Sequence, residues 1–155
     1  MIHCDLRTAN ILLHDSGLHY HPKITDFGCA KHCDDEGIAK EVSTSFPLEW
    51  ASPEFLKTSK SSKFSDIWAF GVCIYEMINS GCKPFEEYST QELKSNIIHF
   101  GNQLSLESFL FPEAKTLFSD CWTMEPKKRP TFSQILERLN EAEKQTAVVV
   151  KIKDH

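Results

Sequence analysis

Apolar and polar positions in the first third of the chain follow the pattern of short strands and loops. The segments NILLH (10–14) and KITDF (23–27) are apolar runs of strand length, and the segment DSGLHYHP between them carries turn residues. This pattern predicts a two-stranded hairpin. Residues 28–45 lose this periodicity and gather polar side chains, which predicts a long exposed loop.

Helical periodicity begins after Trp50. The segment SDIWAFGVCIYEMIN (65–79) is apolar on nearly all sides, which is typical of a helix buried inside a helical domain. Ser89 and Glu92 form the S-x-x-E pattern of a capping box, so a second helix is expected to begin there. A third helix is predicted by five apolar residues with helical spacing, which are Ala114, Leu117, Phe118, Cys121 and Trp122.

A last helix is predicted to begin near Pro130. Thr131 and Gln134 form a second capping box, and an apolar stripe follows. The stripe consists of Phe132, Ile135, Leu136 and Leu139. Beyond it the sequence TAVVVKIKDH is expected to be a frayed or extended tail. The pattern therefore predicts a mainly α fold, in which a short hairpin and a loop precede roughly four helices.

Composition limits the class of protein. The chain has 155 residues, of which 41% are hydrophobic and 25% charged, and this composition and length suit one globular domain. A net charge of −5 argues against general nucleic-acid binding, which requires a basic face. We find no apolar run of about 18 residues and no signal-peptide pattern, so no membrane span is expected.

The cysteines favour a reduced, cytoplasmic compartment. Six cysteines are scattered along the chain without a C-x-x-C pair, which suits free thiols better than a disulfide framework. Cys29, His32 and Cys33 do lie close together, but a zinc site usually needs four ligands. No second ligand cluster follows them, so we do not predict zinc binding.

Three oxygen-bearing side chains suggest a magnesium site near the start of the chain. Asp5 and Asn10 lie on one short stretch, and Asp26 follows at the exit of the predicted hairpin. Carboxylate and amide oxygens are ligands that Mg²⁺ prefers, and phosphoryl transfer also needs a carboxylate near the attacking hydroxyl. Each residue alone could be an ordinary surface group, and only their joint spacing supports this chemistry.

Several motifs, in order, resemble those of the protein kinase superfamily. HCDLRTANILL resembles the catalytic loop H-R-D-L-x-x-x-N, DFG matches the magnesium motif, and SPE resembles A-P-E. FSDIWAFGVCIYEM and CWTMEPKKRPTF resemble helices of the C-terminal lobe. The resemblance implies a protein-kinase-like C-terminal lobe, built from a short β-hairpin and a helical bundle, with residues 1–140 as a partial kinase domain and 141–155 as a tail.

The resemblance implies a role for each residue of the site. Asp5 would be the catalytic base that accepts the proton of the substrate hydroxyl, and Arg7 would lie near the γ-phosphate. Asn10 and Asp26 would bind Mg²⁺, and Leu12 would form the floor beneath the adenine of ATP. The implied cofactors are therefore ATP and Mg²⁺.

The resemblance also implies structural roles. His3 and Phe27 would pack together and set the active position of the Asp-Phe-Gly segment. Asp66 would hydrogen-bond the backbone of the catalytic loop. Glu54 and Arg129 would form a buried ion pair, and removing one partner of such a pair costs roughly 3–5 kcal/mol.

The resemblance favours a tyrosine kinase over a serine/threonine kinase. Serine/threonine kinases usually carry Lys two residues after the catalytic Asp, whereas this chain has Arg7. FPLEWASPEF resembles the F-P-x-x-W-x-x-P-E segment of tyrosine kinases. A tyrosine hydroxyl projects further from its backbone, so the 47–50 stretch would hold the substrate peptide further from Asp5.

Cys4 departs from the family pattern. In H-R-D the arginine binds a phosphate on the activation loop, and a thiol cannot do so. Residues 26–54 also contain no tyrosine, so the usual phosphate acceptor is missing together with its arginine. We expect that tyrosine phosphorylation of this loop does not switch the protein.

The motifs that normally precede the catalytic loop are missing. The chain contains no G-x-G-x-x-G and no V-A-I-K, so the N-terminal lobe is expected to be absent. Without the helix that precedes the loop, apolar surface around Ile67–Ile78 would be exposed and could bind a partner. Three interpretations remain: a fragment of a tyrosine kinase, inactive alone; a serine/threonine kinase fragment; or a catalytically dead scaffold or binding module.

Overall fold

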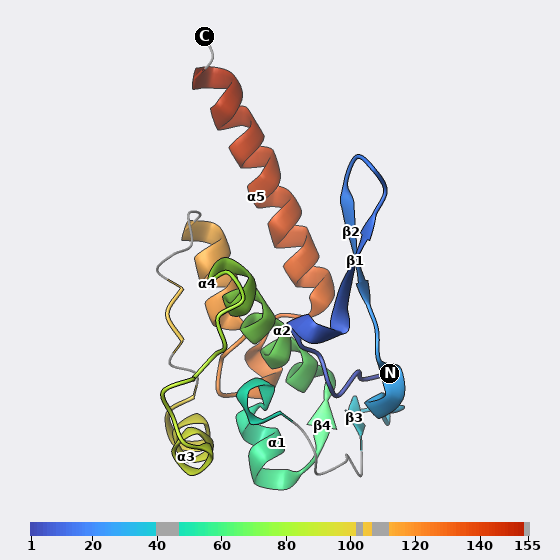
Figure 1. Cartoon of the computed structure of the whole chain (residues 1–155), viewed down its shortest axis with the longest axis vertical. Coiled ribbons are helices and arrows are strands. Elements are labelled where there is room, and N and C mark those ends of the chain that lie inside the picture. The colour runs from blue at the N-terminus through green and yellow to red at the C-terminus, as the bar shows by residue number, and fades with distance from the viewer. Residues whose placement is uncertain (40–46, 102–103, 107–111, 154–155) are drawn as a thin grey trace.

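The computed structural model describes residues 1–39, 47–101, 104–106 and 112–153 (Figure 1). Helices dominate this part of the chain. The α-helices are α1 (Pro53–Thr58), α2 (Lys63–Ile78), α3 (Thr90–Phe100), α4 (Pro112–Asp120) and α5 (Phe132–Lys153). The strands are β1 (Ile11–Asp15), β2 (Tyr20–Ile24), β3 (Ile38–Ala39) and β4 (Ser61–Ser62). Four 3₁₀ turns are η1 (Thr8–Asn10), η2 (Phe27–Cys29), η3 (Leu48–Trp50) and η4 (Pro126–Lys128).

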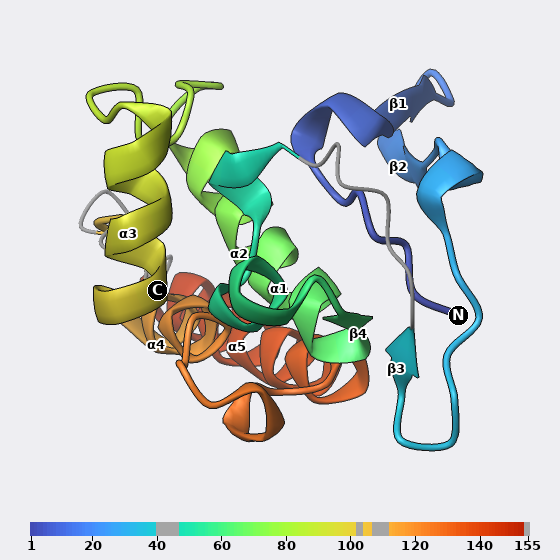
Figure 2. The same ribbon diagram turned by 90° about the horizontal axis from the view of Figure 1, so that it is seen from below.

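The hairpin and α5 extend from the same end of the molecule, with α1, β3 and β4 at the opposite end (Figure 1). Seen from below, α3 and the N-terminal segment lie on opposite sides of the helical body (Figure 2). The predicted site residues of the first thirty positions are therefore held on one flank of this body.

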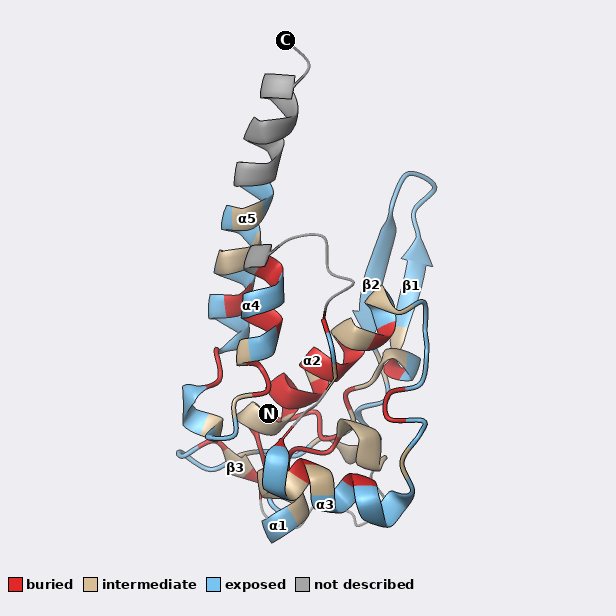
Figure 3. Ribbon diagram, turned by 90° about the vertical axis from the view of Figure 1, so that its left-hand side faces the viewer, coloured by how far each residue is buried: buried red, intermediate tan, exposed pale blue. Residues whose placement is uncertain are grey.

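Helix α2 is the core of the fold, as its apolar sequence predicts. Ser62 caps its N-terminus, with Ser65 completing the capping box. Trp68 and Val72 are almost fully buried, in the cluster that also holds Leu117 of α4. Figure 3 shows α2 as the most continuously buried helix of the structure.

The prediction of exposed apolar surface around Ile67–Ile78 is wrong. Of the large apolar side chains in this stretch, Met77 alone is exposed, at 51%. Leu6, in the predicted catalytic loop, packs against Ala69 and Cys73, and Trp50 packs against the same cluster. The N-terminal segment and η3 therefore cover the face of α2 that was expected to be bare.

Both predicted capping boxes are present. The Ser89 amide donates to Glu92 Oε2 across 3.0 Å at the start of α3, and the Glu92 amide donates to Ser89 Oγ. At α5 the Thr131 amide donates to Gln134 Oε1 across 2.8 Å, and the Gln134 amide returns a bond to Thr131 Oγ1. These bonds satisfy amides that the first helical turn leaves without partners.

The prediction of a frayed or extended tail at residues 146–155 is wrong as far as Lys153, because α5 continues to that residue. Each residue added to an existing helix gains one backbone hydrogen bond without a new nucleation cost. The residues that precede the tail, Glu141–Lys144, are also good helix formers.

The third predicted helix is shorter than expected: α4 ends at Asp120, and the buried Cys121 and Trp122 lie in the turn beyond it.

The predicted hairpin is present, with a tighter turn. Strands β1 and β2 pair antiparallel from Ile11↔Ile24 to Asp15↔Tyr20. The turn needs only residues 16–19, closed by the Ser16 amide bonding the His19 carbonyl across 3.1 Å. Nine of its ten strand residues are exposed.

The stretch 28–45 is not an uninterrupted loop. It includes part of η2, and β3 pairs antiparallel with β4 through Ile38↔Ser62 and Ala39↔Ser61. This pairing joins the segment after Asp-Phe-Gly to the start of α2. Residues 40–45 lie outside the described residues.

Within the part of the chain that the structure describes, no helix is both long enough and apolar enough to span a membrane.

Candidate active site

Asp66 of α2 fixes the catalytic-loop backbone. Its Oδ2 accepts from the His3 amide across 2.7 Å, and its Oδ1 accepts from the Cys4 amide across 3.1 Å. Burial raises the pKa of the Asp66 carboxyl, while the two amide bonds act in the opposite direction. The arrangement ties the N-terminal segment to a helix more than sixty residues away in the sequence.

Asp5 and Asn10 are in direct contact. The Asn10 amide nitrogen donates to the Asp5 carbonyl across 2.8 Å and to Asp5 Oδ2 across 3.1 Å. Both bonds use the nitrogen, which leaves the amide oxygen of Asn10 as the atom suited to a metal ion. The turn η1, which ends at Asn10, brings the two side chains together.

The second carboxylate oxygen of Asp5 is held differently. Asp5 Oδ1 lies 3.5 Å from Arg7 Nε, and both atoms are buried without a hydrogen-bond partner. The two charges attract, but their geometry is not that of a hydrogen bond. A carboxylate can accept the proton of a hydroxyl that hydrogen-bonds to it.

Asp26 is positioned through its neighbour Thr25. The Thr25 amide donates to the Asn10 carbonyl across 2.9 Å, which closes the base of the hairpin. Asp26 itself has left-handed backbone dihedrals (φ 59°), and its Oδ1 accepts from the Gly28 amide across 3.3 Å. A Cβ at Gly28 would lie 3.2 Å from that oxygen, so a side chain there would crowd the carboxylate.

The structure thus joins Asp5 to Asn10 directly and Asp26 to Asn10 through Thr25. Among the described residues, no hydrogen bond connects Asp26 with either of the other two side chains. No group of three or more His, Cys, Asp or Glu side chains in those residues is arranged to hold a metal ion. The amide oxygen of Asn10 and the exposed carboxylate of Asp26 are hard oxygen donors, which suits Mg²⁺.

His3 connects the catalytic loop to the Asp-Phe-Gly segment. Its Nδ1 accepts from the Asp5 amide across 3.3 Å, and its Nε2 lies 3.0 Å from the Thr25 carbonyl. These bonds require the tautomer with hydrogen on Nε2. The His3 and Phe27 rings meet edge to face, with centroids 5.0 Å apart. The buried His3 is therefore fixed from three sides.

Leu12 lies on β1 and is 57% exposed. It is paired with Lys23 across the hairpin. The apolar side chain of Leu12 can contact a planar ring, and its exposure leaves this face of β1 accessible.

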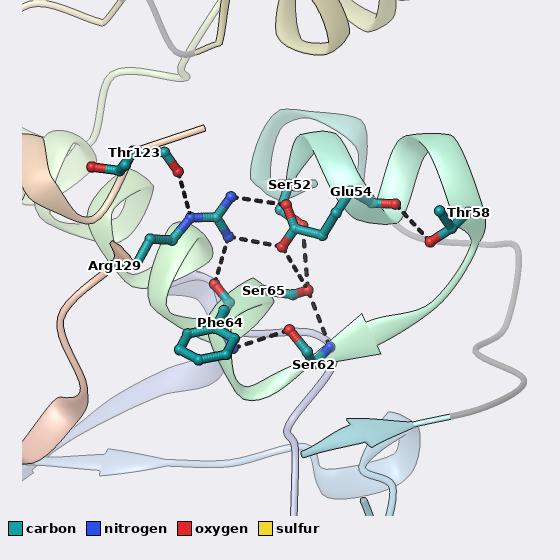
Figure 4. A network of polar contacts seen from close by, with 8 residues as sticks. All are labelled: Ser52, Glu54, Thr58, Ser62, Phe64, Ser65, Thr123 and Arg129. Atoms are coloured by element: carbon teal, nitrogen blue, oxygen red, sulfur yellow. Dashed lines mark hydrogen bonds and ion pairs between the residues drawn. The ribbon is translucent and has the colours of Figure 1, made fainter. Parts of the chain in front are cut away.

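Glu54 and Arg129 form an ion pair with two parallel hydrogen bonds, each 2.8 Å long (Figure 4). Arg129 also donates to the carbonyls of Phe64 and Thr123 across 2.8 Å, and its guanidinium lies over the Trp68 ring. Burial alone would raise the pKa of Glu54, but the hydrogen bonds and charge of Arg129 outweigh it and lower that pKa. This group joins α1, α2 and the segment before α5.

Two polar residues of α2, Glu76 and Ser65, were missed by sequence reasoning. Trp50 Nε1 donates to Glu76 Oε2 across 3.0 Å, and Glu76 is buried in α2. Ser65 Oγ donates to Glu54 Oε1 across 3.2 Å. A glutamate inside a nearly continuous apolar helix was the available signal for Glu76, because a buried carboxylate requires a partner.

Cys4 is buried and has left-handed backbone dihedrals (φ 65°). Burial, followed by the nearby charge of Asp66, raises the pKa of its thiol to about 11. The side chain is therefore neutral at physiological pH. A neutral thiol at this position offers no cation for a phosphorylated loop.

A family model described as protein tyrosine and serine/threonine kinase matches residues 1–139. The mouse "Cytoplasmic tyrosine-protein kinase BMX" is 33% identical over 138 residues, covering 89% of this chain and 21% of that protein. The rat "Megakaryocyte-associated tyrosine-protein kinase" is 33% identical over 139 residues, covering 90% of this chain and 28% of that protein. The "Vascular endothelial growth factor receptor 2" of Coturnix japonica is 33% identical over 139 residues, covering 89% of this chain and 10% of the receptor. The chain therefore spans less than a third of each of these relatives.

Proposed function

The chain belongs to the protein tyrosine and serine/threonine kinase family, and we propose that it forms the substrate-binding part of a tyrosine kinase. The reaction transfers the γ-phosphoryl group of ATP to a tyrosine hydroxyl of a protein. The observation that carries the proposal is the contact of Asp5 with Asn10, held next to Asp26 by the hairpin base.

In the proposed reaction, the Asp5 carboxylate orients the tyrosine hydroxyl and accepts its proton. Arg7, whose Nε lies 3.5 Å from Asp5 Oδ1, stabilises negative charge near that carboxylate. Asn10 and Asp26 would hold Mg²⁺, which supplies positive charge to the phosphate oxygens. Leu12 would support the adenine ring from the face of β1.

The preference for tyrosine is supported by the 47–50 platform. Trp50 is anchored to the buried Glu76, and Glu49 pairs with Lys83 across 3.0 Å. A platform fixed at both residues can hold a peptide backbone at a constant distance from Asp5. Two of the three relatives named above, the mouse and rat proteins, are tyrosine-protein kinases by name, which also supports this preference.

The proposed reaction needs groups that the 155 residues do not contain. The Gly-rich loop and the ATP-binding lysine of the kinase mechanism are absent from the sequence. We therefore propose that the isolated chain transfers no phosphate, and that a separate segment completes the ATP site. The second candidate function is a catalytically dead scaffold that binds other proteins, and the presence of Asp5, Asn10 and Asp26 together favours the kinase over it.

A chimera tests the proposal. The segment of mouse BMX that directly precedes the region matched by this chain would be fused to Ile2. The chimera would then be incubated with Mg²⁺-ATP and a peptide that contains one tyrosine. We expect transfer to this peptide, none to a matched phenylalanine peptide, and loss of activity in Asp5→Asn and Asp26→Ala. Phosphate on a matched serine peptide instead would favour a serine/threonine kinase. A folded chimera that binds ATP without transfer would favour the scaffold.

A further inference from the structure

Two histidines face each other across the hairpin. Strand register pairs His14 of β1 with His21 of β2. The Ser16–His19 bond closes the turn, and backbone hydrogen bonds alternate along an antiparallel pair. The next bonded pair is therefore His14 and His21, which places their Cα atoms about 5.5 Å apart. Pro22, which lacks an amide hydrogen, falls at a non-bonded position, in agreement with this register.

Both imidazoles project from the same face, because directly paired residues share a face of the sheet. Their Cβ atoms are about 4.5–5.5 Å apart, which lets both rings reach one ion between them. Both side chains are exposed and have no hydrogen-bond partner within the described residues, so their ring nitrogens are accessible. Imidazole nitrogen is a preferred ligand of Zn²⁺, Cu²⁺ and Ni²⁺.

We propose that His14 and His21 form a two-ligand site for a divalent transition-metal ion of this class. Because no third His, Cys, Asp or Glu among the described residues is arranged to join them, water fills the remaining coordination positions. The site is distinct from the oxygen donors suited to Mg²⁺. It does not depend on the proposed phosphoryl transfer.

The position of the pair gives the site a structural consequence. Nine of the ten strand residues are exposed, and an isolated two-stranded hairpin is marginally stable in water. A metal ion that joins His14 to His21 would link the strands at the second residue pair from the turn, three pairs before the end of β1–β2 pairing at Ile11↔Ile24. The base of the hairpin carries Asn10 and Thr25. Bound metal would therefore reduce hairpin opening next to the candidate active site.

Nickel provides a direct test, because bound paramagnetic Ni²⁺ broadens the NMR signals of nearby amides. Ni²⁺ would be titrated into the full ¹⁵N-labelled chain, with EDTA added at the end. We expect the amide signals of residues 12–21 and Lys23 to broaden first and to recover with EDTA. His14→Gln and His21→Gln should each weaken binding by at least about tenfold, because the second imidazole of a chelate binds intramolecularly. The double variant should bind more weakly than either single variant, because it retains neither imidazole.

A swap of neighbouring residues provides the matched control. The variant L13H/H14L keeps the number of histidines but moves one imidazole to the opposite face, so it should lose affinity as His14→Gln does. His99→Gln removes an exposed imidazole from α3 and should leave binding unchanged. The proposal is wrong if broadening centres on another part of the chain, or if L13H/H14L binds Ni²⁺ with the affinity of the wild type. It is also wrong if each single variant lowers the affinity for Ni²⁺ only about twofold. Circular dichroism would verify that each variant is folded.

Discussion

The guanidinium of Arg129 donates to both carboxylate oxygens of Glu54, which lies 75 residues earlier in the chain. The Arg129 side chain is fully buried, and that of Glu54 is 21% exposed. The pair connects the end of the activation segment to the helices that follow.

Glu54→Gln should destabilise the fold by about 3–5 kcal/mol, because it leaves the buried guanidinium without its counter-charge. Urea denaturation measures this change directly. Lys128→Ala is the control, since it removes an ion pair of the same 2.8 Å length from an exposed position and should change little. Equal effects of the two substitutions would show that the Glu54 pair is not desolvated in solution.

The same pair predicts a loss of stability in acid. The pKa of Glu54 is lower in the folded chain than its unfolded value of about 4.3. Its contribution is therefore present above that unfolded value and is lost as pH falls through the folded pKa. Asp66 contributes with the opposite sign, because its folded pKa is raised. In denaturation measured between pH 6 and about pH 3, Glu54→Gln should show a weaker pH dependence than the wild type.

Asp66→Ala should free the catalytic-loop backbone. The substitution leaves the amides of His3 and Cys4 without acceptors, and each buried donor without an acceptor costs about 1–3 kcal/mol. Hydrogen exchange at these two amides should accelerate more than exchange within α3. Asp120→Ala is a matched control, because Asp120 pairs with Arg138 at the surface. Unchanged exchange at His3 and Cys4 would contradict the anchoring role of Asp66.

Gly71→Ala should be destabilising despite the higher helix propensity of alanine. A Cβ at Gly71 would lie 2.5 Å from Nε1 of Trp122 and 3.2 Å from Cys121 Cβ. Such overpacking costs about 1–3 kcal/mol. Thermal denaturation of Gly71→Ala, Trp122→Phe and the double variant tests the cause. The cost of Gly71→Ala should be smaller in the Trp122→Phe background, and additive effects would exclude this clash as the cause.

The buried thiols should resist alkylation. Burial raises the pKa of Cys4 to about 11 and that of Cys121 to about 12, whereas Cys82 is exposed. At pH 8, iodoacetamide should modify Cys82 first, as followed by peptide mass spectrometry. In urea all three should react at similar rates. Rapid modification of Cys4 in the folded chain would contradict its burial.

Local patterns were readable from the sequence, because their partners are close along the chain. The capping boxes at Ser89 and Thr131 each join residues three positions apart. Helix α2 and the hairpin have clear periodicities. The roles proposed for Asp5, Asn10 and Asp26 were predicted from the resemblance of several motifs in order. The structure adds the contact between Asp5 and Asn10, which the sequence did not predict.

Long-range contacts were not readable from periodicity. The β3–β4 pairing joins residues 24 positions apart, through Ile38 and Ser62, and both strands are only two residues long. The expectation of a bare face on α2 failed because Leu6 packs there, and a single leucine in a loop does not reveal its contact. The helical continuation through residues 146–153 was missed because the apolar stripe that ends at Leu139 stops before the helix does.

Helix α2 also acts as a spacer of fixed length. It is bonded to the N-terminal segment through Asp66 and to Trp50 through Glu76. These ten steps span about 15 Å of a continuous helix at 1.5 Å per residue. Inserting or deleting one residue between them would rotate the two anchors by about 100° relative to each other. The separation between the N-terminal segment and Trp50 is therefore set by the length of α2, and sequence changes in α2 would be tolerated only if they preserve that length.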